Sequence, residues 1–329
     1  MNDFHDWLFQ KQAFVESVLE KNLPKASDET HLNEAIKYSV LNGGKRMRSL
    51  LILAIAEIVE VPPNAIEKII CAVEFIHAYS LVHDDMMDEA NLRRGQPTVH
   101  TKYDANTALL VGDIMVIRAY EYLQPIQSKH LSKILGLFNQ TAREVCEGQQ
   151  YDIEFESRTN VAIPEYLKMI EYKTAVLVGA SMKMGAIVAK APIKDQDAIY
   201  EFGKYLGIAF QLQDDYLDSF GDSKTFGKQI GGDIVENKKT YLYLKAMELS
   251  NNEVKSTLLN LYQEDRIKGD NEVNKVKQIF QETGAALDTK KIIKKYTQKA
   301  FHVLNDLNIT SEKKTFLRQF GTSLMDREV

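Results

Sequence analysis

Apolar residues recur at the three- and four-residue spacing of a helix over most of this 329-residue chain. The pattern predicts helices over residues 1–30 (with a loop at 24–28), 31–41, 49–61, 69–87, 107–123, 131–155, 165–190 and 197–220, followed by plainer amphipathic helices to the end. No stretch of convincing length alternates apolar and polar residues as a strand would. Neither a short repeat nor a change in composition marks a boundary, so the sequence predicts an all-α fold with a single domain over residues 1–329.

One predicted helix ends in a group of acidic residues, Asp84, Asp85 and Asp88. On a helix, residues four apart lie on one face, so Asp84 and Asp88 should stack one turn apart. His77 and Leu81 extend the same stripe. Carboxylate oxygens on one rigid face suit Mg²⁺, which is usually held by one or two carboxylates together with substrate phosphates and water. The alternative is an acidic helix end that faces solvent.

The chain repeats this arrangement about 130 residues later. Asp214, Asp215 and Asp218 follow a second helical run, and Asp214 and Asp218 again lie four residues apart. A single acidic group is easily explained by solvation. Two groups with the same spacing favour a shared chemical role.

Basic residues stand near these acidic groups in three places. Gly43 and Gly44 precede Lys45, Arg46 and Arg48, and two glycines would let the backbone approach an anion closely. A helix C-cap followed by cations that complement the helix dipole explains the same residues equally well. The other two places are Arg93-Arg94, whose guanidinium groups match phosphate oxygens, and a later lysine group at Lys228, Lys238 and Lys239.

Composition and charge narrow the possible functions. The net charge is −5, which gives no support for nucleic-acid binding. Two cysteines, Cys71 and Cys146, have no metal-binding or redox spacing and are expected to be buried thiols in a reducing, cytoplasmic compartment. The N-terminus has no apolar signal core, and the most apolar run, residues 50–61, is too short to span a bilayer, so we expect a soluble protein without membrane insertion.

The polar groups together indicate a reaction of diphosphates. No Ser–His–Asp arrangement, nucleophilic cysteine setting or dinucleotide-binding glycine motif is evident. Metal ions held between two carboxylate clusters would bind a diphosphate and stabilise it as it leaves. An apolar channel among small residues would accommodate an apolar tail on that diphosphate, and the basic groups would hold a second anionic substrate.

The motifs from Gly43 to Lys238 resemble those of the trans-isoprenyl diphosphate synthases, the family that includes farnesyl and geranylgeranyl diphosphate synthases. The resemblance covers nearly the whole chain. It implies a helical bundle of the isoprenoid synthase type around a deep central cavity, usually a homodimer with three Mg²⁺ ions. It also implies a head-to-tail condensation: an allylic diphosphate ionises, isopentenyl diphosphate attacks the carbocation, and a proton and diphosphate are released.

The resemblance assigns roles to particular residues of this chain. Asp84 and Asp88 would hold two Mg²⁺ ions and Asp214 the third. The residues that would contact the allylic diphosphate are Arg93, Lys173, Thr174, Gln211, Lys228 and Lys238. Those that would bind isopentenyl diphosphate are Lys45, Arg48, His77 and Arg94. Two of these residues have a plainer alternative, because His77 could be a buried polar residue and Lys173 a surface lysine.

In this family the residues before the first acidic motif form the floor of the cavity and set product length. Ser80 and Tyr79 stand four and five residues before Asp84, about 6–7.5 Å deeper along the helix. A small Ser80, a bulky Tyr79 and no insertion in the motif resemble synthases of twenty-carbon product. Fifteen carbons are a close second, because Met86, Met87 and Met115 could narrow the channel, and a long-chain product is less expected.

Three other functions share part of this chemistry. A terpene cyclase would not need the isopentenyl site at Lys45 and Arg48. A non-catalytic synthase subunit should have lost aspartates that this chain retains. A diphosphate hydrolase would release a free alcohol and no longer diphosphate.

Overall fold

The computed structural model describes residues 2–24, 30–221, 231–263 and 269–326. Helices dominate the part of the chain so described, which confirms the predicted all-α class. The chain divides into two compact units: Met1–Arg143, Leu177–Tyr200 and Asp306–Leu317 form the first, and Glu144–Val176, Glu201–Asn305 and Arg318–Val329 form the second. The single domain expected from the sequence stays a prediction.

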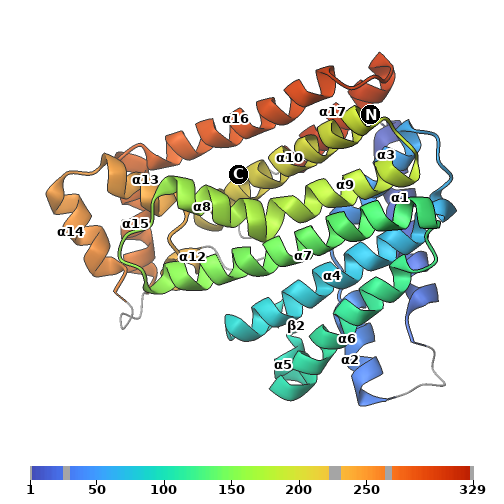
Figure 1. The fold of residues 1–329 in the computed structure, drawn as a ribbon. Helices are drawn as coiled ribbons and strands as arrows, with labels where there is room; N and C mark the ends of the chain where they lie inside the picture. The colour runs from blue at the N-terminus through green and yellow to red at the C-terminus, as the bar shows by residue number, and fades with distance from the viewer. Residues whose placement is uncertain (1, 25–29, 222–230, 264–268, 327–329) are drawn as a thin grey trace. The chain divides into compact units, whose positions relative to one another are not determined.

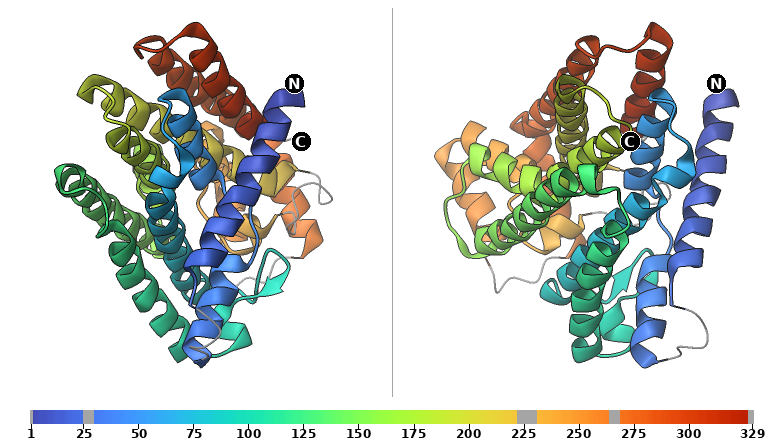
Figure 2. Two further views of the ribbon diagram at one scale, coloured as in Figure 1. Left: turned by 90° about the vertical axis from the view of Figure 1, so that its right-hand side faces the viewer. Right: turned by 45° about the vertical axis from the view of Figure 1, so that its right-hand side comes forward.

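The first unit is built around helix α4 (Glu67–Met87), which packs along α6 (Ala105–Leu123) (Figure 1). Helices α1 (Asn2–Asn22) and α3 (Met47–Ile58) pack together and against α4 (Figure 2). The remaining elements are α2 (His31–Leu41), the 3₁₀ turn η2 (Pro63–Ala65), strands β1 (Leu92–Arg93) and β2 (Gln96–Pro97), α5 (Val99–Lys102), the first part of α7 (Ser128–Ser157), most of α9 (Val176–Val188) and the start of α10 (Ile193–Phe220).

The second unit packs shorter helices around the rest of α10. They are α8 (Ile163–Ile170), the π-helical segment η3 (Glu171–Ala175), α12 (Gly232–Val235), α13 (Tyr241–Leu249), α14 (Asn252–Leu261), α15 (Asp270–Glu282), α16 (Ala285–Asn305) and the end of α17 (Ser311–Met325) (Figure 1). Its core holds buried side chains from α8, α10, α13 and α15, among them Tyr166, Leu212, Leu242 and Phe280. Two pairs of tyrosine rings pack together in this unit, Tyr166 with Tyr241 and Tyr243 with Tyr262, with ring centroids 6.3 and 4.3 Å apart.

Most predicted helices agree with the structure to within two or three residues at their ends. Helix α2 has the predicted bounds, because Thr30 caps its first turn by accepting a hydrogen bond from the Asn33 N–H at 3.2 Å. Its end is set by Gly43 and Gly44, which adopt φ values of 69° and 113° that favour glycine. The predicted helix over 49–61 begins earlier and ends before Pro62, at Ile58.

Three expectations need correction. The predicted helix over 165–190 contains the π-helical segment η3, whose single extra residue scarcely changes an apolar pattern. A short hairpin, β1–β2, stands where no strand was expected. Cys71 is buried as predicted, and burial raises the pKa of its thiol to about 12, but Cys146 is exposed because its position on α7 faces outward.

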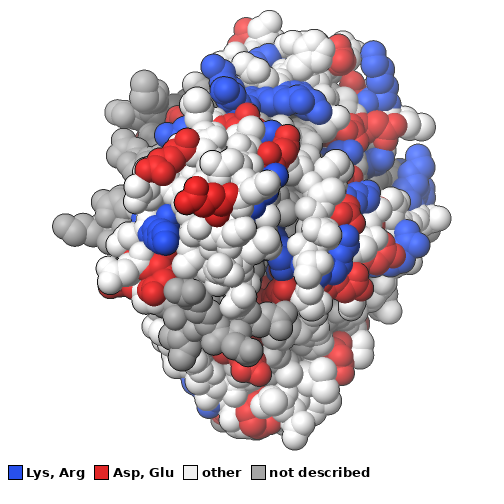
Figure 3. All heavy atoms as spheres, turned by 90° about the vertical axis from the view of Figure 1, so that its left-hand side faces the viewer, with Lys and Arg blue, Asp and Glu red and all other residues white. Residues whose placement is uncertain are grey.

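The described residues bear on two further sequence expectations, the absence of nucleic-acid binding and of membrane insertion. On the face drawn in Figure 3, Lys and Arg side chains are interspersed with Asp and Glu, so the described residues form no wide basic area there of the kind that binds nucleic acid. Among the same described residues, every helix is too short or too polar to serve as a membrane span.

Candidate active site

The first acidic motif lies at the C-terminal end of α4. Asp84 and Asp85 are inside the helix, whereas Asp88 is the residue after it, with φ −84° and ψ 0°. The Asp88 N–H still donates to the Asp84 carbonyl at 2.9 Å, so the last turn is held. Asp88 thus ends the helix while it keeps the one-turn hydrogen bond to Asp84, and the expected stacking of the two carboxylates stays a prediction.

A tight hairpin follows this helix end and turns two arginines back toward it. Strand β1 pairs with β2, and Arg94 and Gly95 at its turn have φ values of 55° and 74°. Two successive positive φ values are typical of the hairpin turns that match strand twist. Thr98 secures the hairpin, because its Oγ1 donates to the Ala90 carbonyl at 2.7 Å.

Arg93 forms an ion pair with the middle aspartate of the motif. Its Nε donates to both oxygens of Asp85 at 2.8 and 2.9 Å, and its Nη2 lies 3.4 Å from Asp84 Oδ2. Burial raises the pKa of Asp85 although Arg93 opposes the shift, since only 4% of this residue is exposed. The two adjacent aspartates thus have different environments. Asp85 is buried and accepts two short hydrogen bonds from Arg93, whereas Asp84 has one longer contact with the same guanidinium group.

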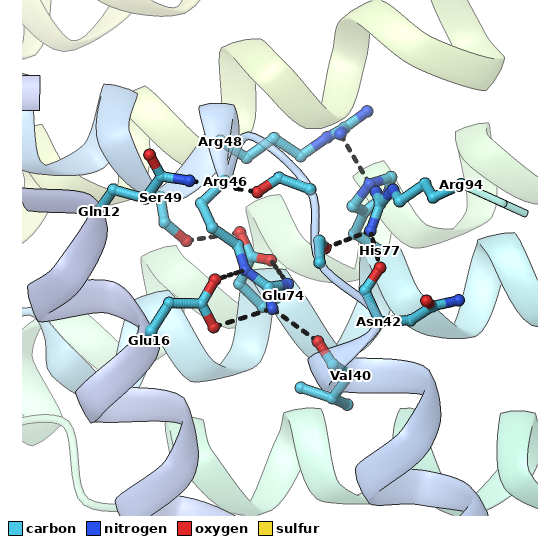
Figure 4. Close-up of polar contacts among 12 residues, drawn as sticks. Gln12, Glu16, Val40, Asn42, Arg46, Arg48, Ser49, Glu74, His77 and Arg94 are labelled. Carbon is cyan, nitrogen blue, oxygen red and sulfur yellow. Dashed lines mark hydrogen bonds and ion pairs between the residues drawn. The ribbon is translucent and has the colours of Figure 1, made fainter. Parts of the chain in front are cut away.

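Arg48, His77 and Arg94, three of the residues predicted to bind isopentenyl diphosphate, lie around the Gly43-Gly44 turn (Figure 4). We refer to these three side chains as the arginine–histidine cluster. Arg48 Nη1 lies 3.0 Å from His77 Nε2, and Arg94 donates to the carbonyls of Asn42 and Gly43. Because a guanidinium can only donate, His77 Nε2 is the acceptor and His77 is neutral.

Arg94 crosses the turn directly over Gly44. A Cβ on Gly44 would stand 2.7 Å from the Arg94 guanidinium carbon, closer than real contacts allow. The sequence suggested that these glycines end a helix or let the backbone approach an anion. The structure shows the helix end and adds that Gly44 makes room for a cationic side chain.

Among the described residues, no carboxylate forms an ion pair with Arg48 or Arg94, although Glu74 lies near enough to act on both charges. Burial lowers the pKa of Arg48 to about 10, with Glu74 opposing and Arg94 adding to the shift. Burial, followed by the charges of Arg48 and Arg94, lowers the pKa of His77 well below its usual value. The Nε of Arg48 is buried and has no hydrogen-bond partner in the described part of the chain. An anion placed here would satisfy a donor and relieve repulsion between cations.

Arg46, one of the clustered cations of the candidate anion site, is paired with protein groups. Its guanidinium contacts Glu16 at 2.7 and 3.1 Å and Glu74 at 3.1 Å, and it donates to the Val40 carbonyl at 2.7 Å (Figure 4). Burial alone would lower the pKa of Arg46, but the two glutamates raise it above its usual value. Its φ of 50° places it in the left-handed region immediately before α3, between exposed Lys45 and partly buried Arg48.

The second acidic motif lies within α10, which continues past it to Phe220. Asp215 is buried and accepts hydrogen bonds from Tyr166 and from Gln211 Nε2, the latter at 2.9 Å. Burial raises the pKa of Asp215 to about 6 against the effect of both hydrogen bonds. Asp218 accepts from the Asp233 N–H at 3.0 Å. Tyr166 is a site residue that no sequence signal indicated.

Two of the predicted allylic ligands, Lys173 and Thr174, lie on the π-helical segment η3. Lys173 Nζ contacts Asp152 Oδ2 at 2.6 Å, and Thr174 Oγ1 donates to Gln211 Oε1 at 3.0 Å. We refer to Asp152, Lys173, Thr174 and Gln211 as the Lys173 cluster. Sequence reasoning noted Asp152 only as a polar residue in a helix, because its partner is 21 residues away along the chain.

Of the two remaining lysines predicted to contact the allylic diphosphate, the structure describes Lys238 but not Lys228. Lys238 Nζ lies 2.9 Å from Glu236 Oε2, and its N–H donates to the Asp233 carbonyl at 2.9 Å. Lys228 lies outside the described residues. Neighbouring Lys239 binds the last carbonyls of α7, at Phe155 and Glu156, at 2.7 and 2.8 Å.

The two residues expected to set product length are on adjacent positions of α4. Ser80 Oγ donates to the His77 carbonyl at 2.8 Å, so its hydroxyl is satisfied within the helix. The Tyr79 ring packs edge-on against His83, with centroids 4.8 Å apart. His83 in turn fills the space beside Gly112 of α6, where a Cβ would collide with its ring.

Among the described side chains, no group of three or more His, Cys, Asp or Glu is arranged to hold a metal ion. The donors that are present nevertheless fit Mg²⁺. Asp84 and Asp88 offer oxygen ligands at one helix end, and Mg²⁺ commonly takes one or two carboxylates and completes its shell with phosphate oxygens and water.

Comparisons with known proteins identify the family of this chain. A sequence model of the polyprenyl synthetase family matches residues 29–283. A geranylgeranyl diphosphate synthase of Methanosarcina mazei is 36% identical over 245 residues, which are 74% of this chain and 75% of that protein. A short chain isoprenyl diphosphate synthase of Methanocaldococcus jannaschii is 37% identical over 279 residues, 83% of each protein. A crystal structure of a geranylgeranyl pyrophosphate synthase has a TM-score of 0.92 and 42% identity over 98% of this chain and 99% of that one.

Proposed function

The chain belongs to the polyprenyl synthetase family, and from this premise we propose that it is a geranylgeranyl diphosphate synthase. It is a trans-prenyltransferase: it would condense isopentenyl diphosphate head-to-tail with allylic diphosphates and release diphosphate. Relatives and a structural neighbour that bear this name support the proposed product.

The arginine–histidine cluster carries the proposal. It gathers the guanidinium groups of partly buried Arg48 and exposed Arg94, an unsatisfied guanidinium N–H and a neutral histidine in one place, beside the turn at Gly44. A diphosphate is the kind of anion that can bind several guanidinium groups at once, because each fork pairs with two phosphate oxygens. We assign this cluster, with exposed Lys45, to isopentenyl diphosphate.

We assign the allylic diphosphate to the acidic motifs and to Arg93, Lys173, Lys228 and Lys238. Asp84, Asp88 and Asp214 would hold Mg²⁺, with three ions expected, and the bound metal would stabilise the charge that develops on the leaving diphosphate. Arg93 is oriented by Asp85 and Lys173 by Asp152, so both cations are held in place before substrate arrives. Thr174 and Gln211, joined by a hydrogen bond, would complete the contacts to the diphosphate.

Product length would be set on α4 by Tyr79, with Ser80 leaving the tail room to pass. The ring of Tyr79 is supported by His83, so it is a firm candidate for the floor. Farnesyl diphosphate is the second candidate product. Of the methionines that could narrow the channel, Met115 is fully buried and Met87 is 53% exposed, so Met87 at the helix end is the weaker obstacle.

The test is the chain length of the product, measured by mass spectrometry after incubation of the purified protein with Mg²⁺, isopentenyl diphosphate and each allylic starter in turn. Mainly twenty-carbon diphosphate supports the proposal, and a product that stops at fifteen carbons replaces it with farnesyl diphosphate synthase. Tyr79→Ala is expected to lengthen the product, whereas Tyr79→Phe keeps the ring and should not. An unchanged product from Tyr79→Ala removes Tyr79 as the floor.

The same incubation separates the other candidate functions. A terpene cyclase would consume an allylic diphosphate in the absence of isopentenyl diphosphate and form a hydrocarbon or alcohol. A hydrolase would yield the free allylic alcohol without elongation. A non-catalytic synthase subunit would give no product with any starter.

We also propose that the enzyme is a homodimer. Helix α6 presents three exposed apolar side chains, Leu109, Leu110 and Ile117, each with about half of its area accessible. Exposed apolar patches of this kind often mark protein–protein contacts. Sedimentation equilibrium that gives the monomer mass at micromolar concentration would contradict the proposal. The cytoplasmic location stays a prediction from the sequence.

A further inference from the structure

Gly148 of α7 lies directly against the backbone of the π-helical segment η3. A Cβ at Gly148 would stand 2.7 Å from both the Cα of Lys173 and the carbonyl carbon of Tyr172, and closer still to the Lys173 nitrogen. These are backbone atoms, so no side-chain rotation could make room. Any residue larger than glycine would therefore force α7 and η3 apart.

The part of η3 that touches Gly148 carries Lys173 and Thr174. A π-helical turn contains one residue more than an α-helical turn, so it changes the direction in which the side chains around it point. Lys173 then reaches Asp152, and Thr174 reaches Gln211. Asp152 lies four residues after Gly148 and on the same face of α7, so one face supplies both the close approach and the carboxylate.

A second glycine in the same helix lacks this backbone contact and serves as a comparison. Gly136 of α7 has no atom within 4 Å of the place where its Cβ would be. Glycine inside a helix is less favourable than alanine, so a glycine without such a contact has no packing reason to be there. Gly148 has a packing reason to be glycine, because its Cα lies against the backbone of η3.

We propose that Gly148 is a positioning residue for the allylic diphosphate: it lets α7 approach η3 closely enough to place Lys173 and Thr174 at that substrate. This inference rests on the proposed function, since it concerns the same allylic subsite. Gly148 touches no substrate and acts only through the position of η3. Its loss should therefore affect the allylic substrate and leave the isopentenyl diphosphate site, which is built from other elements, unchanged.

The experiment compares Gly148→Ala with Gly136→Ala, the same substitution in the same helix. Steady-state kinetics give KM for farnesyl diphosphate and for isopentenyl diphosphate, and calorimetry gives the affinity for an unreactive thio analogue of farnesyl diphosphate. Gly148→Ala is expected to weaken allylic binding and kcat about tenfold or more, as small displacements of positioned groups do, with the KM for isopentenyl diphosphate unchanged. Gly136→Ala should match the wild type in every measurement.

If the two variants had equal KM values for farnesyl diphosphate and equal affinities for its thio analogue, the role of Gly148 would be overturned and the proposed function would stay intact. An equal rise in KM for both substrates in Gly148→Ala would also overturn this role, because a general disturbance of the fold would give that result. A wild-type protein that neither elongates nor binds the analogue would overturn both. If Gly148→Ala yields no folded protein, Asp152→Asn tests the same link at unchanged side-chain size, and a normal allylic KM in that variant would refute the proposal.

Discussion

The arginine–histidine cluster and the Lys173 cluster are built in opposite ways. In the first, Arg48 and Arg94 lie near a neutral histidine, and burial and like charges lower the pKa of Arg48 and of His77. In the second, Lys173 is already bound to a carboxylate, Asp152, at 2.6 Å. One cluster holds positive charge without a counter-ion among the described residues, and the other holds a cation with its partner in place.

This difference shows how a chain can prepare two anion sites by separate means. The buried Nε of partly buried Arg48 has no hydrogen-bond partner among the described residues, which costs stability and is explained most simply by a ligand that supplies an acceptor and a negative charge. A paired lysine contributes to the fold and must share its partner when a diphosphate binds. Arg46 marks the boundary between the two cases: it stands two residues from Arg48 but has Glu16 and Glu74 as partners, which makes it structural.

The largest expected effect comes from the carboxylates that would hold the metal at the allylic diphosphate. Asp84→Ala and Asp214→Ala should each lower kcat by roughly 10³-fold or more, since metal stabilisation of a leaving diphosphate is worth several kcal/mol. The initial rate of diphosphate release measures this, with circular dichroism as the check on folding. Asp113→Ala, an exposed aspartate on α6, is the control. Near-normal turnover in a folded Asp84→Ala variant would rule Asp84 out as a metal ligand.

The next effect separates the two clusters by substrate. Arg48→Met should raise KM for isopentenyl diphosphate about 10- to 100-fold, and Lys173→Met should do the same for the allylic diphosphate, as expected for one charged hydrogen-bonding group each. Each variant should leave the other KM within about twofold. If either variant raised both constants equally, the assignment of one substrate to each cluster would fail.

Stability should change in opposite directions in these same two variants. Arg48→Met removes an uncompensated cation and should leave the free energy of unfolding unchanged or higher. Lys173→Met leaves Asp152, whose side chain is 17% exposed, without its cation and should lower that free energy by about 1–2 kcal/mol. Urea denaturation measures both, and Arg118→Met, at an exposed ion pair with Glu121, should be near neutral. A destabilised Arg48→Met variant would contradict the contrast between the clusters.

The smallest effect is the pH dependence that His77 contributes to folding stability. The pKa of His77 is lowered in the folded state, so below about pH 6.5 the unfolded chain binds a proton there that the folded protein does not. Folding stability should therefore fall as the pH falls below that value, by up to about 1.4 kcal/mol per pH unit. His77→Gln should remove this slope, while His302→Gln on exposed α16 should retain it. Identical pH profiles for wild type and His77→Gln would show that His77 titrates normally.

Local pattern was enough to predict most of the helices and the residue types of the site. The bounds of α2 and the end of α6 follow from capping residues and from Pro125, which act within one or two turns of the chain. The π-helical segment η3 was missed, because one added residue hardly alters the spacing of apolar positions over a long helix. The hairpin that holds Arg93 and Arg94 was missed because its strands are only two residues long.

The sequence by itself determined the helical class, the two acidic motifs and the basic residues, because helical periodicity and motif spacing are properties of neighbouring residues. Tertiary structure alone decided which of these charges are paired. Asp84 and Asp85 are identical neighbours, yet Arg93 donates from Nε to both oxygens of Asp85 and reaches Asp84 only at 3.4 Å. Arg46 is paired with two glutamates, whereas Arg48 Nε has no partner among the described residues. The partners that make the difference, such as Glu74 for Arg46 and Tyr166 for Asp215, lie 28 and 49 residues away and meet only when the helices pack.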